Sequence, residues 1–140
     1  MPQTVRDFMT PEPVTLPGTS SIIDGARLMR DGAIGDVIVL DEDGEVSGIV
    51  TDRDIAIRAV AEGRDPLTTQ LGIVASKELS TLTPDQPISE AARLMKDKAI
   101  RRIPVVEAGR VVGVLSLGDL AARLDPESVL GRVSQAPPSE

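Results

Sequence analysis

The sequence predicts an α/β (α+β) fold in which one β-α-β-β-α unit occurs twice, as tandem repeats packed with internal pseudo-twofold symmetry. Two observations predict it. The first is a collinear repetition about 66 residues apart, clearest where Ala26-Arg27-Leu28-Met29 returns as Ala92-Arg93-Leu94-Met95. The second is that each copy alternates apolar residues at helical spacing with short runs rich in Val and Ile. We expect the two copies to bury apolar faces against each other and to leave clefts between them that suit a ligand.

The first copy is assigned to residues 1–68 and should begin with a short strand. Ser20 or Ser21 can cap the next helix, which is expected to run to about Asp31. The elements that follow are indicated by β-branched runs, polar turn residues and a terminal glycine: a strand at Val37–Leu40, a turn at Asp41–Gly44, a strand at Val46–Val50, and a helix from about Asp52 to Glu62 ended by Gly63.

The second copy is assigned to residues 69–133 and repeats this order. A short helix within Thr69–Ala75 is expected to bring the chain back for the second pass. The predicted elements after it are a helix at Pro87–Lys98, a strand at Ile103–Val106, a turn at Ala108-Gly109, a strand at Val111–Leu115 and a helix at Leu117–Leu124. Beyond Asp125-Pro126 a further helical turn or two is expected to reach Val133, and Ser134–Glu140 should be a disordered tail.

Composition excludes several classes of function. The net charge is -7, and Phe8 is the only aromatic residue, so neither the basic surface nor the stacking platform of a nucleic-acid-binding protein is present. The sequence has no Cys and no His, which argues against thiolate chemistry, His-based triads and zinc sites of the usual type. No apolar run approaches the roughly 18 residues that a membrane span needs. We therefore expect a cytoplasmic protein with no membrane or nucleic-acid partner.

Charge is shared unevenly between the copies. Residues 1–69 carry six Arg against thirteen Asp and Glu, whereas residues 70–140 carry nine basic and nine acidic residues. An anionic ligand should therefore meet less repulsion in the second half. The acidic run Asp41-Glu42-Asp43 is interpreted as a solvated turn, with weak binding of a divalent cation as the alternative. No metal site is predicted.

A Thr/Ser-x-x-Asp motif occurs at the equivalent place in both copies. Thr51 and Asp54 form the first, Ser116 and Asp119 the second, and each follows a Gly-apolar-apolar strand end. The spacing places both side chains beside the unpaired N–H groups of a helix start, where a phosphate or a ribose can bind. The alternative is a capping box, in which the same two side chains satisfy the helix's own N–H groups. Recurrence in a repeat favours the binding interpretation but leaves the alternative open.

These residues carry a family resemblance. Both copies resemble CBS (cystathionine-β-synthase) domains, and the chain resembles a small stand-alone prokaryotic CBS pair, or Bateman module, over about residues 5–131. The resemblance rests on the Ala-Arg-Leu-Met helices, on the Gly-x-x-Thr/Ser-x-x-Asp strand ends, and on three stretches: Met9-Thr10-Pro11, Thr51-Asp52-Arg53-Asp54-Ile55 and Arg101-Arg102-Ile103-Pro104-Val105-Val106.

The resemblance implies two clefts related by a pseudo-twofold axis, each a potential site for AMP, ADP, ATP or S-adenosylmethionine, within a disc-like homodimer. By the same resemblance, Thr51 and Ser116 would contact phosphate or ribose, and Asp54 and Asp119 would hold the ribose hydroxyls. The groups implied to surround adenine lie near Thr15-Leu16, Val37, Thr81-Leu82 and Ile103-Pro104. The nucleotide or S-adenosylmethionine would be a regulatory ligand, and no cofactor is required.

The copies differ where the phosphates would lie. Arg101-Arg102 aligns with Gly35-Asp36, so the second copy offers guanidinium groups where the first offers a carboxylate. Arg53 in the first motif could clamp a phosphate or pair with Asp54 or Glu62 on its own helix. We therefore expect unequal clefts, with phosphate held chiefly by Arg101 and Arg102.

The resulting interpretation is a non-catalytic regulatory module that senses an adenosyl ligand and signals in trans to an unidentified effector protein. The rival interpretation is a ligand-independent homodimeric interaction protein with non-functional clefts. An enzyme, such as a metal-dependent nucleotide hydrolase, is disfavoured because the sequence lacks His, Cys and a P-loop.

Overall fold

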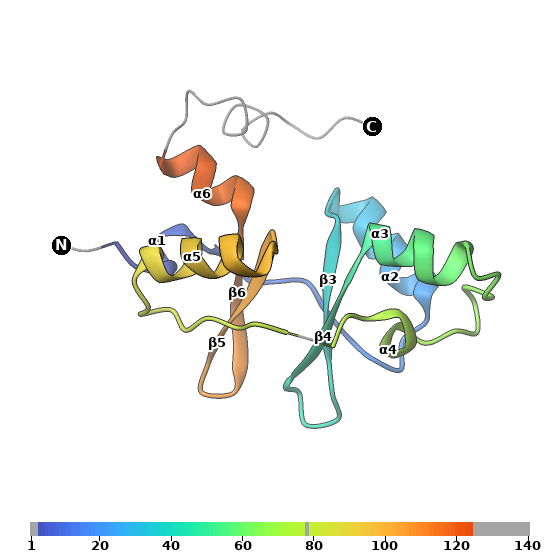
Figure 1. The fold of residues 1–140 in the computed structure, drawn as a ribbon. Coiled ribbons are helices and arrows are strands. Elements are labelled where there is room, and N and C mark those ends of the chain that lie inside the picture. The colour runs from blue at the N-terminus through green and yellow to red at the C-terminus, as the bar shows by residue number, and fades with distance from the viewer. Residues whose placement is uncertain (1–2, 78, 125–140) are drawn as a thin grey trace. The chain divides into compact units, whose positions relative to one another are not determined.

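The computed structural model describes residues 3–77 and 79–124 of the 140-residue chain (Figure 1). Its contacts divide the chain into two compact units. One, the continuous unit, is Pro13–Leu79; the other, the split unit, comprises the described parts of Met1–Glu12 and Ser80–Glu140. The helical turns expected up to Val133 and the disordered tail expected at Ser134–Glu140 lie outside the described residues.

The continuous unit contains a three-stranded sheet with the strand order β2-β3-β4. Strands β2 and β3 are parallel, and β3 and β4 form an antiparallel hairpin. The elements in chain order are β2 (Thr15–Pro17), α2 (Ile22–Gly32), β3 (Asp36–Leu40), β4 (Val46–Thr51), α3 (Asp52–Asp54), the π-helix η1 (Ile55–Val60) and α4 (Leu71–Val74).

Local chemistry accounts for the first helix and the hairpin of this unit. The Ser21 hydroxyl accepts a hydrogen bond from the Asp24 amide at 3.2 Å, so Ser21 is the cap of α2 among the two predicted candidates, Ser20 and Ser21. Alternate residues of β3, Val37 and Val39, are buried in the same core as Ile22. Gly44 has φ +80°, a backbone conformation that glycine adopts without steric cost, and it lies in the predicted hairpin turn.

The split unit has the same plan, with the strand order β1-β6-β5. Its elements are α1 (Val5–Phe8), β1 (Thr10–Pro11), α5 (Ile88–Lys98), β5 (Arg102–Glu107), β6 (Arg110–Ser116) and α6 (Leu117–Leu124). A parallel bridge between Leu82 and Val105 takes the place of the β2–β3 pairing. The core of the unit combines residues from the N-terminal segment with residues of the second repeat: Val5, Phe8, Leu82, Ala91, Met95, Ile103, Val105, Leu115 and Leu120.

Each unit takes its short helix and one edge segment from the beginning of the other repeat. Helix α1 belongs to the split unit and α4 to the continuous unit, and their residue numbers differ by the repeat spacing of 66. Thr10 pairs with Val114 in the split unit, as Ser76 pairs with Ile49 in the continuous unit. The compact units are therefore exchanged with respect to the sequence repeats: residues 3–12 pack with the second repeat, and residues 69–77 pack with the first.

The glycines of the Gly-x-x-Thr/Ser-x-x-Asp motifs allow these edge segments to approach closely. A Cβ atom at Gly113 would lie 2.8 Å from the Thr10 carbonyl oxygen and 2.7 Å from the Met9 sulfur. At the equivalent Gly48 it would lie 3.0 Å from the Ser76 carbonyl oxygen. A side chain at Gly113 would displace the backbone of Thr10, so the split unit requires glycine there. At Gly48 the contact is tight, and a side chain would require the Ser76 backbone to move by a few tenths of an ångström.

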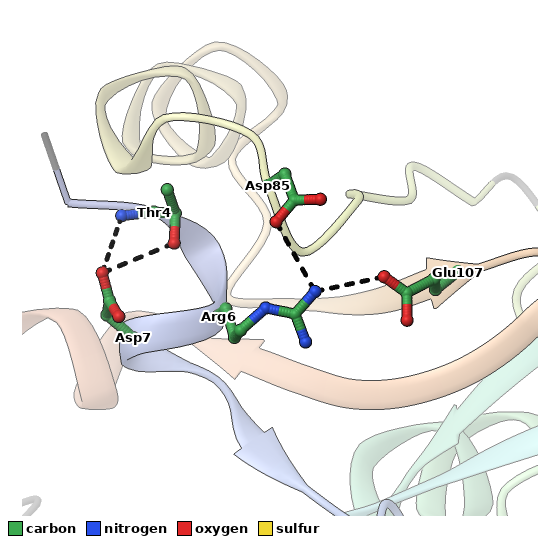
Figure 2. A network of polar contacts seen from close by, with 5 residues as sticks. All are labelled: Thr4, Arg6, Asp7, Asp85 and Glu107. Carbon is green, nitrogen blue, oxygen red and sulfur yellow. Dashed lines mark hydrogen bonds and ion pairs between the residues drawn. The ribbon is translucent and has the colours of Figure 1, made fainter.

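Polar contacts also fix the N-terminal segment to the split unit (Figure 2). The Arg6 Nη2 atom lies 3.1 Å from Glu107 Oε2 and 3.5 Å from Asp85 Oδ1, and the hydrogen bond to Glu107 raises the pKa of the guanidinium above its usual value. On the same segment the Thr4 amide donates to Asp7 Oδ2 at 3.0 Å. These contacts are exposed, so burial of Val5 and Phe8 contributes more to holding the segment.

The second helix of the first repeat differs from its prediction. A helix was expected from Asp52 to Glu62, but a three-residue α-helical turn passes into the π-helix η1. The amide of Ala61, which caps η1, bonds five residues back to the Ala56 carbonyl at 2.9 Å, the spacing of a π-helix. The expected stop holds, because Gly63 has φ +70°. Among the described residues, no helix has the length and apolarity that crossing a membrane requires.

Candidate functional site

The candidate site of the split unit is the corner where β6 passes into α6. Arg102, at the start of β5, lies opposite Ser116, at the end of β6, and the Leu117 amide donates to the Arg101 carbonyl at 2.7 Å. Asp119 follows in the first turn of α6. The antiparallel register therefore brings two guanidinium-bearing residues and the Ser-x-x-Asp motif to one end of one hairpin.

The side chains of Ser116 and Asp119 have different partners at this corner. The Ser116 hydroxyl oxygen accepts from the Asp119 amide at 2.9 Å, which leaves its own proton available for donation. The Asp119 Oδ2 atom accepts from the hydroxyl of Thr10, on strand β1, at 3.2 Å. No hydrogen bond joins the Asp119 side chain to the Ser116 amide, so the two described motif residues do not form a reciprocal capping box.

At the equivalent corner of the continuous unit, the side chains of the motif bond to backbone amides of their own helix turn. The Thr51 hydroxyl oxygen accepts from the Asp54 amide at 3.1 Å, and Asp54 Oδ2 accepts from the Thr51 amide at 2.9 Å. These two bonds make a complete capping box. The second carboxylate oxygen of Asp54 lies 3.8 Å from Arg58 Nε, and the side chain is only 17% exposed. In this corner the capping alternative describes the observed contacts.

The two corners also differ in the charged residues that border them. Arg101 and Arg102 are exposed, and the positions opposite them across the hairpin are Leu117 and Ser116. In the continuous unit Asp36 lies opposite Thr51, so a carboxylate occupies the place of a guanidinium. Arg53 was expected to clamp a phosphate or to pair along its helix with Asp54 or Glu62. Among the described residues it forms no ion pair, and Arg58 approaches Asp54 instead.

The residues implied to surround adenine fall into two groups. Thr15 is the first residue of β2 and pairs with Ile38, and Thr81, its counterpart in the repeat, immediately precedes the isolated bridge between Leu82 and Val105. Val37 and Ile103 are completely buried, each in the core of its unit. Pro104 is also buried. The side chains of Val37 and Ile103 therefore serve as core residues, and what they can offer a ligand is backbone.

Each unit thus assembles one corner from its own residues. The continuous unit brings Thr51 and Asp54 together, and the split unit brings Arg101, Arg102, Ser116 and Asp119 to one hairpin end. The contribution of Thr10 was not predicted, although Met9-Thr10-Pro11 was noted as a motif. The signal that could have found it is the spacing of 66, which makes Thr10 the counterpart of Ser76. Among the described residues, no group of three or more His, Cys, Asp or Glu side chains could hold a metal ion.

Comparisons of the sequence and of the structure with known proteins both find CBS domain proteins. The CBS domain model matches residues 5–60 and 72–125. The CBS domain-containing protein YhcV of Bacillus subtilis is 39% identical over 117 residues, which are 84% of this chain and 82% of that protein. The crystal structure of Hypoxic Response Protein I with two coordinated zinc ions has a TM-score of 0.78 at 30% identity, covering 85% of this chain and 97% of that chain. The CBS domain pair of protein MJ0100, in complex with 5′-methylthioadenosine and S-adenosyl-L-methionine, has a TM-score of 0.80 at 26% identity, covering 91% of this chain and 100% of that chain.

Proposed function

The chain belongs to the CBS domain family, and from this premise we propose that it is a regulatory module that binds an adenosine-containing ligand and signals in trans. CBS-pair proteins are generally non-catalytic regulatory modules, which supports the absence of an enzymatic role. The candidate ligands are AMP, ADP, ATP and S-adenosylmethionine. The complex of protein MJ0100 with 5′-methylthioadenosine and S-adenosyl-L-methionine supports an adenosyl ligand, because these two molecules share the adenosyl group.

The observation that carries the proposal is the corner of the split unit. The Ser116 hydroxyl and the Asp119 carboxylate lie at the end of one hairpin, beside the start of α6, and the backbone of Arg101 and Arg102 pairs with the same end. A ribose needs acceptors for its hydroxyl protons, which Asp119 supplies. A phosphate needs donors, and guanidinium groups match its geometry with paired N–H groups. Ser116 adds a proton that its capping bond does not use.

The two corners contribute unequally in this proposal. At the continuous unit's corner the capping box uses Thr51 and Asp54, and Asp36 would repel a phosphate. At the split unit's corner Arg101 and Arg102 attract it. We therefore assign phosphate binding chiefly to the split unit, where the adenine base contacts backbone near Thr81. The backbone near Thr15 is the equivalent place in the continuous unit.

Regulation requires that the ligand distinguish two arrangements of the protein. A ligand shifts an equilibrium only by the difference between its affinities for the two states. In the proposed mechanism the ligand changes the packing of the repeats or of a homodimer, and an effector protein reads the changed surface. The homodimer and the effector are part of the proposal.

The test is calorimetric titration of the full chain with AMP, ATP, NAD and S-adenosylmethionine. We expect micromolar or tighter binding of at least one ligand, and a loss of about 10-fold in affinity for ATP in Arg102→Ala, which corresponds to one charge-assisted contact. Arg110→Ala is the matched control, because Arg110 is exposed on β6 at the opposite end of the same hairpin. Equal ATP affinity in Arg102→Ala and Arg110→Ala would refute phosphate binding at this corner.

A second candidate function is a ligand-independent homodimeric scaffold. The observation that favours it is the complete capping box of Thr51 and Asp54, whose polar groups are satisfied without a ligand. A scaffold should show no thermal shift with any of the four ligands, because a ligand stabilises a protein only by binding the folded state. Its native mass should be that of a dimer, and unchanged by ligand.

A further inference from the structure

We propose that Thr10 is a positioning residue of the split unit's corner, which holds the Asp119 carboxylate in the orientation that receives a ribose. The inference rests on the proposed function and deepens it. It assigns a role in ligand recognition to the N-terminal segment, which belongs to the first repeat in sequence but packs with the second.

The contact that carries the proposal joins residues 109 positions apart. The Thr10 hydroxyl donates to Asp119 Oδ2 at 3.2 Å. The backbone that presents it is fixed by pairing of Thr10 with Val114 and by the close approach of β1 to Gly113. Val5 and Phe8, which are buried in the split unit's core, anchor the same segment two to five residues earlier. Thr10 is therefore held by packing and pairing that do not depend on Asp119.

The corresponding contact does not occur in the continuous unit. Ser76 is the repeat counterpart of Thr10 and pairs with Ile49 through backbone bonds of 2.9 and 3.1 Å. No hydrogen bond joins its side chain to a described residue. Asp54, the counterpart of Asp119, is held instead by the Thr51 amide. Equivalent carboxylates are thus fixed in two ways, one within its own helix turn and one by a distant segment.

The chemistry explains why the second arrangement suits a ligand. An ionised carboxylate has about four acceptor positions on its two oxygens. The Thr10 hydroxyl occupies one position on Oδ2, and Oδ1 has no hydrogen-bond partner among the described residues. A carboxylate held from one side can accept two vicinal ribose hydroxyls with little loss of conformational freedom on binding. Asp54 has already committed one oxygen to a backbone amide and faces Arg58 with the other.

The experiment compares Thr10→Val, Thr10→Ser and the control Ser76→Ala in the full chain. Valine keeps the branched shape of threonine but removes the hydroxyl, and serine keeps the hydroxyl. The readout is the ratio of affinities for AMP and 2′-deoxy-AMP, measured by calorimetry, because this ratio reports contacts to the ribose hydroxyl and a purely structural change would lower both affinities alike. We expect Thr10→Val to reduce the ratio about 3- to 10-fold, as loss of one hydrogen bond predicts, and Thr10→Ser and Ser76→Ala to preserve it.

Asp119→Asn separates failure of this inference from failure of the proposed function. If Asp119→Asn lowers the ratio but Thr10→Val does not, Asp119 binds ribose without help from Thr10 and the inference is overturned alone. If the unmodified chain binds none of the adenosyl ligands, the proposed function and the inference fall together. Unfolding by urea supplies a readout without ligand: when the contact exists, the destabilisation caused by Thr10→Val and that caused by Asp119→Ala should not add. Simple addition of the two would overturn the contact itself.

Discussion

Removing each motif hydroxyl by truncation to alanine would separate capping from binding. Thr51 and Ser116 accept hydrogen bonds from the amides of Asp54 and Asp119 at 3.1 and 2.9 Å, so both hydroxyls satisfy an otherwise unpaired helix N–H group. Thr51→Ala and Ser116→Ala should therefore each lower the free energy of unfolding by about 1 kcal/mol. With a urea dependence of about 1–3 kcal/mol per molar, the unfolding midpoint should fall by roughly 0.3–1 M in each variant.

The two variants should differ in ligand affinity. The Ser116 proton has no acceptor within its capping bond, and Arg102 lies opposite, so loss of this hydroxyl should weaken AMP binding about 5- to 10-fold. At Thr51 the complete capping box and the opposing Asp36 predict less than a 2-fold change. Paired urea titrations and calorimetry on the same preparations give both quantities.

Three outcomes would contradict this reasoning in different places. Equal loss of affinity in the two variants would mean that both corners bind, against the predicted inequality. Loss of stability in Ser116→Ala with unchanged affinity would leave only the capping role at the split unit's corner. Unchanged stability in both variants would show that the hydrogen bonds at 3.1 and 2.9 Å contribute nothing measurable to the helix starts.

Three further predictions concern the supporting structure. Phe8→Ala should lower the free energy of unfolding by about 3–5 kcal/mol, because this 3%-exposed side chain lies in the split unit's core. A loss below about 1 kcal/mol in urea unfolding would show that the N-terminal segment does not pack in that core. Gly113→Ala should cost about 1–3 kcal/mol and speed amide exchange at Thr10, since the new Cβ would lie 2.8 Å from the Thr10 carbonyl oxygen; unchanged exchange would contradict the close approach. Arg30→Met should raise the pKa of Asp31, which a hydrogen bond from Arg30 holds below its ordinary value, in a carbon-detected NMR titration. A lowered pKa of Asp31 stabilises the folded state at pH values above the ordinary carboxyl pKa, and this contribution is lost as pH falls through the lowered pKa of the folded state. Both side chains are exposed, so the free energy of unfolding should change little.

Much of the fold could be predicted because the repeat doubles each local signal. A short apolar run such as Val37–Leu40 could belong to a strand or to a buried helix, but its counterpart at Ile103–Val106 has the same pattern and favours a strand for both. Both runs lie in hairpin strands, β3 and β5. Ser20 or Ser21 was predicted as a cap from the apolar stripe that follows them, and the Ser21 hydroxyl makes that bond. Strand and helix positions depend on residues within a few positions of each other, so a local pattern is enough to locate them.

The exchange of segments could not be predicted from local patterns. Helix α1 has four residues, too few for a periodic stripe, and nothing within it specifies which repeat it packs against. The repeat did contain a clue, because a short helix was predicted near residue 71 and the same spacing places its copy near residue 5. The π-helix η1 could not be predicted from a local pattern either. A change from four-residue to five-residue hydrogen bonding leaves the apolar pattern of a short helix nearly unchanged, so the sequence does not distinguish the two.

At the candidate site too, contacts between residues close in sequence could be predicted and contacts between distant residues could not. The capping box of Thr51 and Asp54 lies within four residues and was one of the two readings of the motif. The partner of Asp119 lies at Thr10, and its contact requires both the exchanged segment and the pairing of β1 with β6. One motif therefore has two outcomes: where the carboxylate finds its donor within the turn it serves the helix, and where a distant strand supplies the donor it remains open to a further partner. Sequence repetition makes the two corners alike, and the residues that border each corner distinguish them. In the continuous unit these are the Asp36 carboxylate and the capping box of Thr51 and Asp54. In the split unit they are Arg101, Arg102 and strand β1.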